Sequence, residues 1–292
     1  IDRDWGLTSY LITTDNLGGI SSGVLLDGGL KDLKVVNYFE TQEYRQALHK
    51  VREWYTKGYI NRDVLFQQES YRDPTSQDDV FARFNLMILE DNLESQSVPK
   101  ISVPLTECIA TTSVAQRVLW GIPANCSHPD KTAQFLNLMY SDREIVNLLQ
   151  YGIEGLHYTI QKDGTMLHEM HTNEESRYFR RYDQAGNLDF LLTAQNLGTD
   201  FEQKRQELES QTKYSKAYGF IFETTEVESE LSAIQSVLDT YQLPLELGTV
   251  DPDTELPVML EKLKEAGIDR VIQEKQRQLD DWAVQQKKSK KG

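Results

Sequence analysis

Residues 117–158 read RVLWGIPANCSHPDKTAQFLNLMYSDREIVNLLQYGIEGLHY, and this stretch decides the fold class. The apolar residues 118–120 predict a strand, and the glycine, proline and asparagine that follow predict a turn over 121–125. Apolar residues then recur at helical spacing and predict two helices, 127–140 and 141–151. A strand that leads through a turn into two helices is typical of an α/β chain.

The ends of these two helices carry residues that favour helix termini. Ser127 precedes Asp130 by three positions, close to a capping box, and Ser141 precedes Glu144 by the same spacing. Gly152 should end the second helix, because glycine adopts a positive φ at little cost. We expect Ala133, Leu136 and Tyr140 to form the apolar stripe of the first helix, widened by Phe135 and Met139. On the second helix we expect Ile145, Val146, Leu148 and Leu149 to face inward.

The composition excludes several classes of ligand. The chain has 292 residues, 39% hydrophobic and 10% aromatic, which is enough for one large core or two lobes. Its formal net charge of −15 repels nucleic-acid phosphates and anionic lipid surfaces, so neither is expected as the primary ligand. No run approaches the roughly 18 apolar residues of a membrane span. The chain does not begin with Met, and we expect a processed or truncated piece.

The usual catalytic and metal-binding motifs are absent from the sequence. It holds no GxSxG, HExxH, kinase or nucleotide-binding signature and no CxxC pair. His168 and His171 lie on a predicted hairpin arm, where residues three apart point to opposite faces. We therefore expect no catalytic residue, no metal and no cofactor. Cys108 and Cys126 could be free buried thiols or could form a disulfide.

The rest of the chain alternates between periodic segments and turn residues. Thr41, Asp251 and Asp269 are candidate helix caps, and Gly58 and Gly267 are candidate helix ends. The predicted elements are strands 24–26 and 33–37, a helix 41–57, a hairpin about Asp163-Gly164, a polar surface helix 199–213, and helices 228–242, 251–266 and 269–285, with Leu279 buried on the last.

Several runs resemble one known family. The sequence contains IPAN at 122–125, YGIEGLHY at 151–158 and WYTKGYIN at 54–61, and near its end GFIFE, GTVDPDTELP and LKEAGIDRVIQEKQRQLDDW. From Trp5 to Trp282 the chain resembles the extracellular solute-binding proteins of ABC importers, specifically the sugar-binding-like lipoproteins of family 1 with the C-terminal DUF3502 extension. Cys126 stands where that family more often has Ser or Thr, and Glu223 stands where Asp is commoner.

The resemblance implies a fold and a domain order. The fold would be a two-lobe, type II periplasmic-binding-protein-like α/β fold with a helix-rich second lobe. Residues 1–103 and 159–292 would form the second lobe, including an extension domain at 214–282. Residues 104–158 would cross the hinge and return to the first lobe. That first lobe is incomplete, so the chain would be a C-terminal fragment.

The resemblance also implies a function without catalysis. The protein would bind a carbohydrate, in particular an oligosaccharide, between its lobes and deliver it to the permease subunits of an ABC transporter. It would be a monomer on the outer face of the cell membrane, held by an N-terminal lipid anchor that this sequence lacks. Three alternatives stay open: a secreted glycan-degrading enzyme, a binding protein for a non-sugar solute such as a peptide, and a protein-interaction module.

Seven residues are candidates for the ligand cleft. Glu90 and Asn92 follow a predicted buried strand, at the carboxyl end where ligands of α/β folds bind. His157 follows the glycine that ends a helix, where the chain should cross between lobes. Aromatic residues can stack on sugar rings or pack in the core, and both roles stay open. The candidates are Trp5, Tyr10, Glu90, Asn92, Trp120, His157 and Tyr158.

Overall fold

The computed structural model describes residues 8–19, 22–66, 103, 105–116, 120–168, 178, 186–197 and 200–289. The chain divides into two compact units. The first unit comprises Ile1–Met87, Val103–Gln116 and Thr212–Gly292, and the second comprises Ile88–Ser102 and Arg117–Gln211. Residues 159–211 thus group with the segment before them, whereas the predicted boundaries joined them to the C-terminal region. Which unit corresponds to which lobe stays a prediction.

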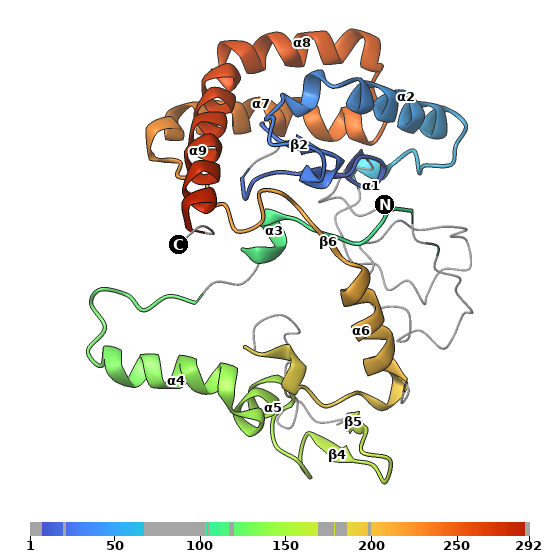
Figure 1. Ribbon diagram of the computed structural model, residues 1–292. Helices are drawn as coiled ribbons and strands as arrows, with labels where there is room; N and C mark the ends of the chain where they lie inside the picture. The colour runs from blue at the N-terminus through green and yellow to red at the C-terminus, as the bar shows by residue number, and fades with distance from the viewer. Residues whose placement is uncertain are drawn as a thin grey trace. The chain divides into compact units, whose positions relative to one another are not determined.

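The first unit is built mainly from helices, with short paired strands between them (Figure 1). Strand β1 pairs antiparallel with β2, Thr14 lying opposite Leu26, and β3 pairs parallel with β6. The elements of this unit are α1 (Thr8–Leu11), β1 (Thr14–Asp15), β2 (Leu25–Leu26), α2 (Gln42–Thr56), β3 (Ile109–Ala110), α3 (Thr112–Ala115), β6 (Lys213–Tyr214), α7 (Glu228–Glu246), α8 (Pro252–Glu265) and α9 (Ile268–Ser289), with short 3-10 turns at Asp27–Gly29, Tyr38–Glu40, Val64–Phe66 and Thr225–Val227.

The predicted helices of this unit are present, and their caps explain where they begin. Thr41 accepts a hydrogen bond from the backbone N–H of Tyr44 and starts α2. Asp251 accepts from Asp253 N and starts α8, with Pro252 in the first turn. Asp269 was expected to cap the last helix, and that prediction was wrong. α9 already begins at Ile268, directly after a glycine whose φ of +91° ends the preceding turn.

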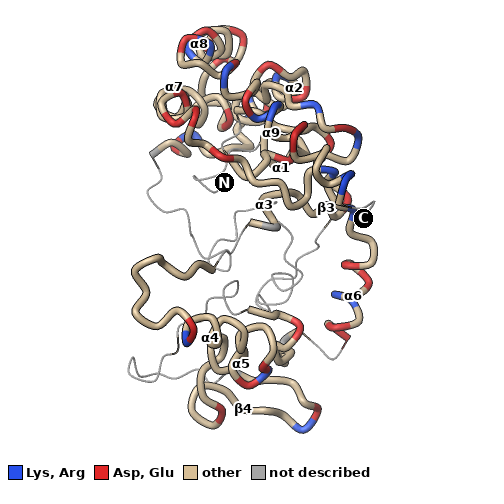
Figure 2. The backbone as a smooth tube through the Cα atoms, turned by 60° about the vertical axis from the view of Figure 1, so that its left-hand side comes forward, with Lys and Arg blue, Asp and Glu red and all other residues tan. Residues whose placement is uncertain are grey.

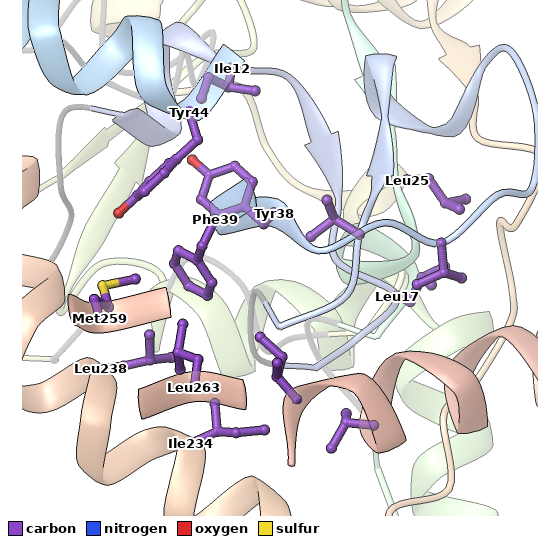
Figure 3. Close-up of a cluster of buried hydrophobic side chains, with 14 of the residues drawn as sticks. Ile12, Leu17, Leu25, Tyr38, Phe39, Tyr44, Ile234, Leu238, Met259 and Leu263 are labelled. Atoms are coloured by element: carbon purple, nitrogen blue, oxygen red, sulfur yellow. The ribbon is translucent and has the colours of Figure 1, made fainter. Parts of the chain in front are cut away.

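Helices α2, α7, α8 and α9 enclose the main core (Figures 1 and 3). The Phe39 ring lies edge-on to the Tyr44 ring, at 5.3 Å between centroids, and the pair faces Met259 and Leu263. The Tyr44 hydroxyl donates to the buried carboxylate of Glu246 at 3.1 Å. Burial raises the pKa of that carboxyl group above its usual range. Leu279 is fully buried, as predicted.

The predicted strand 33–37 does not form as a strand. Val36 makes a single antiparallel bridge with Val24. The neighbouring backbone bonds go to a side chain instead: Val35 N donates to the Gln276 amide oxygen at 2.8 Å, and that amide donates to Leu33 O at 3.0 Å. Apolar alternation therefore marked an extended segment, but a helix side chain takes the place of a partner strand.

The second unit holds two helices, a hairpin and a polar helix. Strands β4 and β5 pair antiparallel around a turn in which Gly164 has φ +84°, so the predicted hairpin is confirmed. The predicted polar helix is α6, in which Phe201 is the buried residue and which carries both acidic and basic residues (Figure 2). The elements are α4 (Pro129–Ser141), α5 (Arg143–Tyr151), β4 (Tyr158–Ile160), β5 (Met166–His168) and α6 (Phe201–Gln211), with 3-10 turns at Leu188–Phe190 and Gln195–Leu197.

The predicted caps of α4 and α5 were wrong in detail. α4 begins at Pro129, and its first flanking residue, His128, makes no side-chain capping bond. Ser141 is the last residue of α4 rather than the cap of α5. Asp142 caps α5 by accepting from Glu144 N and Ile145 N, at 2.9 and 3.1 Å. A carboxylate one residue further on satisfies two free amides of the first turn, so it displaces the serine as cap.

The predicted inward face of these helices was only partly right. Val146 is buried on α5, but Leu148 is 45% exposed. Met139 is the one buried residue of α4, whereas Ala133 and Tyr140 are exposed and Leu136 is partly exposed. Of the predicted apolar stripe of α4 only Met139 is buried, and little of the described chain covers the rest.

Three further predictions concern Trp120, the two cysteines and membrane-spanning helices. Trp120 belongs to no regular element, and residues 117–119 of its predicted strand lie outside the described residues. Cys108 and Cys126 are both free, and Cys108 is exposed rather than buried. Within the part of the chain that the structure describes, no helix is long and apolar enough to cross a membrane.

Candidate functional site

The loop between α5 and β4, residues 152–157, and the first residue of β4 carry two of the predicted site residues, His157 and Tyr158. The loop starts at Gly152, whose φ of +81° and ψ of −141° suit glycine alone. The Gly152 N–H donates to Leu148 O at 3.0 Å and closes the helix. A Cβ at this position would lie 2.4 Å from Nδ1 of His157. The loop therefore needs glycine both for its backbone and for the histidine that packs against it.

The His157 side chain closes the loop. Ile153 N donates to its Nδ1 at 2.8 Å, and the His157 N–H donates to Ile153 O at 2.8 Å. Because Nδ1 accepts a hydrogen bond, the proton of the neutral imidazole sits on Nε2. The half-buried ring therefore presents an N–H donor on its other edge.

Tyr178 completes this arrangement, and the sequence analysis missed it. Its ring lies 5.3 Å from the His157 ring at a tilt of 38°, and its hydroxyl donates to Leu149 O at 2.6 Å. Its ring also lies against Gly152. In the sequence it belongs to a charged and aromatic stretch without periodicity, so no pattern singled it out. We call Gly152, His157 and Tyr178 the aromatic corner.

Tyr158 lies beneath this loop rather than on its surface. It is only 6% exposed and meets the Tyr151 ring edge-on at 6.1 Å. Burial raises the pKa of its hydroxyl, and the carboxylates of Glu154 and Glu144 add to the effect. The Tyr151 hydroxyl in turn donates to Leu192 O at 3.0 Å. Tyr158 thus ties the loop to the small core of the second unit.

The remaining candidates are spread over both units. Trp120, in the second unit, is 46% exposed. Tyr10, in the first unit, packs against a small cluster that includes Val51 and Leu247. The other three predicted residues, Trp5, Glu90 and Asn92, lie outside the described residues. Among the described residues, the structure brings together only His157 and Tyr158 of the predicted set, and it adds Tyr178.

The chemistry of the aromatic corner suits an uncharged ligand. It offers ring faces and an imidazole N–H, which can pack on apolar faces and donate to hydroxyl groups. In the described part of the chain, no group of three or more His, Cys, Asp or Glu side chains is placed to hold a metal ion.

A groove of about 530 Å³ on the first unit has a different character. Trp282 and Phe220 form its apolar wall. Arg277 pairs with Glu274 at 2.6 Å and with Asp281 at 3.0 Å along one helix. Hydrogen bonds from Arg277 and Gln278 hold the pKa of Glu274 at about 2. Arg277, Glu274 and Asp281 in this groove are thus already paired with one another.

Comparison with known proteins gives a consistent result. Residues 216–284 match the family described as Domain of unknown function (DUF3502). The chain is 29% identical over 261 residues to a carbohydrate ABC transporter substrate-binding protein of Streptococcus pneumoniae serotype 4 (strain ATCC BAA-334 / TIGR4). That match covers 87% of this chain and 52% of the relative. The chain therefore spans about half the length of this relative.

Solved structures of one pneumococcal protein share the fold. The N-glycan transport solute binding protein (NgtS) of Streptococcus pneumoniae matches with a TM-score of 0.75 at 26% identity, over 94% of this chain and 62% of that one. Its complex with Man1GlcNAc matches with a TM-score of 0.73 at 27% identity, over 93% and 62%. The predicted fold class, a helix-rich α/β solute-binding fold of which this chain covers only part, is confirmed. In sequence and in fold the chain is similar to the substrate-binding proteins of carbohydrate ABC transporters, as its motifs predicted, and it carries the DUF3502 match at its C-terminal end.

Proposed function

We propose that this chain is the larger part of an extracellular solute-binding protein that captures an oligosaccharide for an ABC importer. The observation that carries the proposal is the likeness over 93% of the chain to a protein solved with Man1GlcNAc. A second solved complex of that protein holds Man5GlcNAc. The relatives are named for binding and transport, and the proposal accordingly assigns no reaction to this chain.

The aromatic corner is the part of the site that the structure supports best. The imidazole of His157 is fixed by the Ile153 N–H, and the Tyr178 ring is fixed by its bond to Leu149 O. Two rings held in place lose little side-chain freedom when a sugar binds, which favours affinity. Trp120 is exposed and could add a stacking face. The roles of Trp5, Tyr10, Glu90, Asn92 and Tyr158 at the cleft remain part of the proposal.

The cellular setting follows from the same likeness. We infer permease subunits of an ABC transporter as the protein partners, and the outer face of a bacterial cell membrane as the location. An N-terminal lipid anchor, carried on sequence outside these 292 residues, would hold the protein there.

Binding measurements test the proposal directly. We would titrate Man5GlcNAc, maltopentaose and a neutral pentapeptide into a chain extended by the segments that the relatives carry and this chain does not span. We expect a saccharide to bind and the peptide not to bind. Binding of the peptide with no saccharide response would overturn the sugar assignment. The 292-residue chain should bind more weakly, because one partial wall excludes less water from the ligand.

Two variants test whether the aromatic corner belongs to the saccharide-binding site. Tyr178→Ala should weaken saccharide binding by about tenfold or more, as expected for loss of a ring in contact with ligand. Tyr59→Ala is the matched control, because Tyr59 is 74% exposed and lies in the first unit. Equal affinities of the two variants would remove the aromatic corner from the site while leaving the transport assignment intact.

A further inference from the structure

Two of the connections between the units, the one after Gln116 and the one before Thr212, start near one pair of short strands in the first unit. The chain leaves the first unit after Gln116 and returns to it at Thr212. Just inside these points β3 pairs parallel with β6, with Ile109 opposite Lys213. The Lys213 N–H donates to Cys108 O at 3.0 Å, and Ser215 N donates to Ala110 O at 2.9 Å. Whatever holds this strand pair also holds the roots of both connections.

A buried carboxylate holds the first of these roots. Asp15 is fully buried and accepts a hydrogen bond from Thr112 N at 3.1 Å and another from the Thr112 hydroxyl. It also accepts from Leu17 N at 3.0 Å. Next to it, the Ser113 hydroxyl donates to the Asn16 side chain at 2.5 Å. A buried carboxylate with three donors fixes the backbone of residues 112–113, four residues before the chain leaves the unit.

The cation beside this carboxylate comes from the far end of the chain. Lys275 on α9 is fully buried, and its Nζ donates to Gly23 O at 3.0 Å and to Asn16 O at 3.2 Å. The ammonium also lies 5.3 Å from the centre of the Phe222 ring. Burial lowers the pKa of Lys275 to about 8, while the nearby Asp15 carboxylate acts in the opposite direction. A buried ammonium needs such partners, since leaving it unpaired would be costly.

The backbone around Lys275 is shaped to receive it. A Cβ on Gly19 would lie 3.2 Å from Nζ of Lys275, and a Cβ on Gly23 would lie 3.3 Å from its Cδ. One residue further along α9, the Gln276 amide bonds to both Leu33 O and Val35 N. Two successive α9 side chains thus bind the backbone at Asn16, Gly23, Leu33 and Val35.

We propose that α9, most of which lies in the segment matching the domain of unknown function, anchors the roots of these two connections, with Lys275 as a positioning residue that acts through the backbone of Asn16, next to Asp15. The segment would then be a built-in part of the first unit rather than an appended module. We call Asp15, Asn16, Thr112 and Lys275 the root cluster. The proposal stands apart from the identity of the ligand, and its test needs no ligand.

Amide hydrogen exchange on the full chain tests the anchor. Lys275→Met keeps the length of the side chain but removes its charge and its donors. Lys287→Met is the matched control, since Lys287 is exposed on the same helix. We expect the amides of Leu17 and Thr112 to exchange about tenfold faster or more in Lys275→Met, while amides in the middle of α8 change much less. The control should leave both sets unchanged.

Two results would overturn the proposal. One is unchanged protection of the Leu17 and Thr112 amides in Lys275→Met. The other is a rise in exchange that is equal at every amide of the unit, because that would report global stability alone. If Lys275→Met does not fold, Thr112→Val decides. This variant should speed exchange at Leu17 and position 112 with α8 unaffected, and an unchanged Leu17 amide would show that the root cluster does not act as one unit.

Discussion

The two units differ sharply in how well their helices are covered. Among the described residues, the main cluster of the first unit holds 23 buried side chains, many of them with no exposed surface, whereas the cluster around β4 and β5 of the second unit holds six. On α8 the apolar stripe through Leu256, Met259 and Leu263 is buried. Figure 3 shows Met259 and Leu263 within this core. On α4 the corresponding side offers Phe135 and Leu138 at 44% and 39% exposure.

This contrast shows that two questions about a helix have different answers: which of its sides is apolar, and whether that side is buried. The pattern tells which side of a helix is apolar. On α8 that side is buried, whereas on α4 most of it is exposed. Whether that side is buried depends on segments elsewhere in the fold, and the chain spans 62% of its solved relatives. The first unit has the partners for its helices within the described residues, and the second unit has few.

The largest expected effect is the loss of a core side chain in the first unit. Leu279→Ala should lower the free energy of unfolding by about 2–5 kcal/mol, because a fully buried leucine leaves a cavity. Urea unfolding followed by hydrogen exchange in α7–α9 measures the loss in this unit. A loss below about 0.5 kcal/mol would contradict the tight packing of this core.

The next effect tests the aromatic corner within the thinly covered unit. Gly152→Ala should destabilise the second unit by about 1–3 kcal/mol, since it forces alanine to a positive φ and pushes a methyl group into His157. Gly155→Ala is the control, because Gly155 also has a positive φ of +78° but has no atom within 4 Å of the added Cβ. Equal losses, measured by exchange in α5, would mean that the histidine contact contributes nothing.

A third prediction uses the buried lysine of the first unit. The folded pKa of Lys275 is about 8, below the value of about 10.4 for an unfolded lysine, so between these values the unfolded chain binds more protons. The contribution of Lys275 to stability therefore rises with pH, by about 1–2 kcal/mol from about pH 8 to about pH 9.5. Asp15 faces this group, alongside the carbonyls of Asn16 and Gly23 and the Phe222 ring.

Comparing the parent with Lys275→Met isolates the increase in stability with pH that Lys275 contributes. Urea unfolding of the parent and the variant over the same pH range should show a slope that the variant lacks. Lys287→Met should keep the slope of the parent. A variant whose stability changes with pH just as the parent's does would show that Lys275 does not titrate in this window.

Much of the fold could be predicted from the sequence where local signals decide it. Thr41 and Asp251 are strong caps, and the helices begin where these residues placed them. Contacts between residues far apart in the chain could not be predicted from the sequence. The bond from Gln276 to Val35 joins positions 241 residues apart, and no local pattern indicates it. The same holds for Tyr178, whose hydroxyl donates to Leu149 O from 29 residues further along the chain.

The fourth prediction applies the contrast to α4. Leu136→Ala should cost about 1 kcal/mol, well below the Leu279→Ala loss, because Leu136 is partly exposed and its truncation leaves little cavity. Met139→Ala on the same helix should cost more, since Met139 is 1% exposed. Exchange in α4 measures both. An equal loss for the two variants would show that α4 is covered as well as α8.

The smallest expected effect concerns charge at the ligand face, and it rests on the proposed function. Inside the first unit a buried cation and carboxylate hold the fold, whereas the aromatic corner offers rings and an imidazole N–H. An oligosaccharide without charge gains nothing from Coulomb attraction, so screening should leave its affinity nearly unchanged despite the net charge of −15. We expect less than about a twofold change in Kd for Man5GlcNAc between about 50 mM and about 500 mM salt. Calorimetric titration of the extended chain measures it, with Tyr178→Ala titrated at both salt concentrations as the control. A tenfold weakening in high salt would mean that charged groups make the site, and would move attention from the aromatic corner to carboxylates such as Glu90.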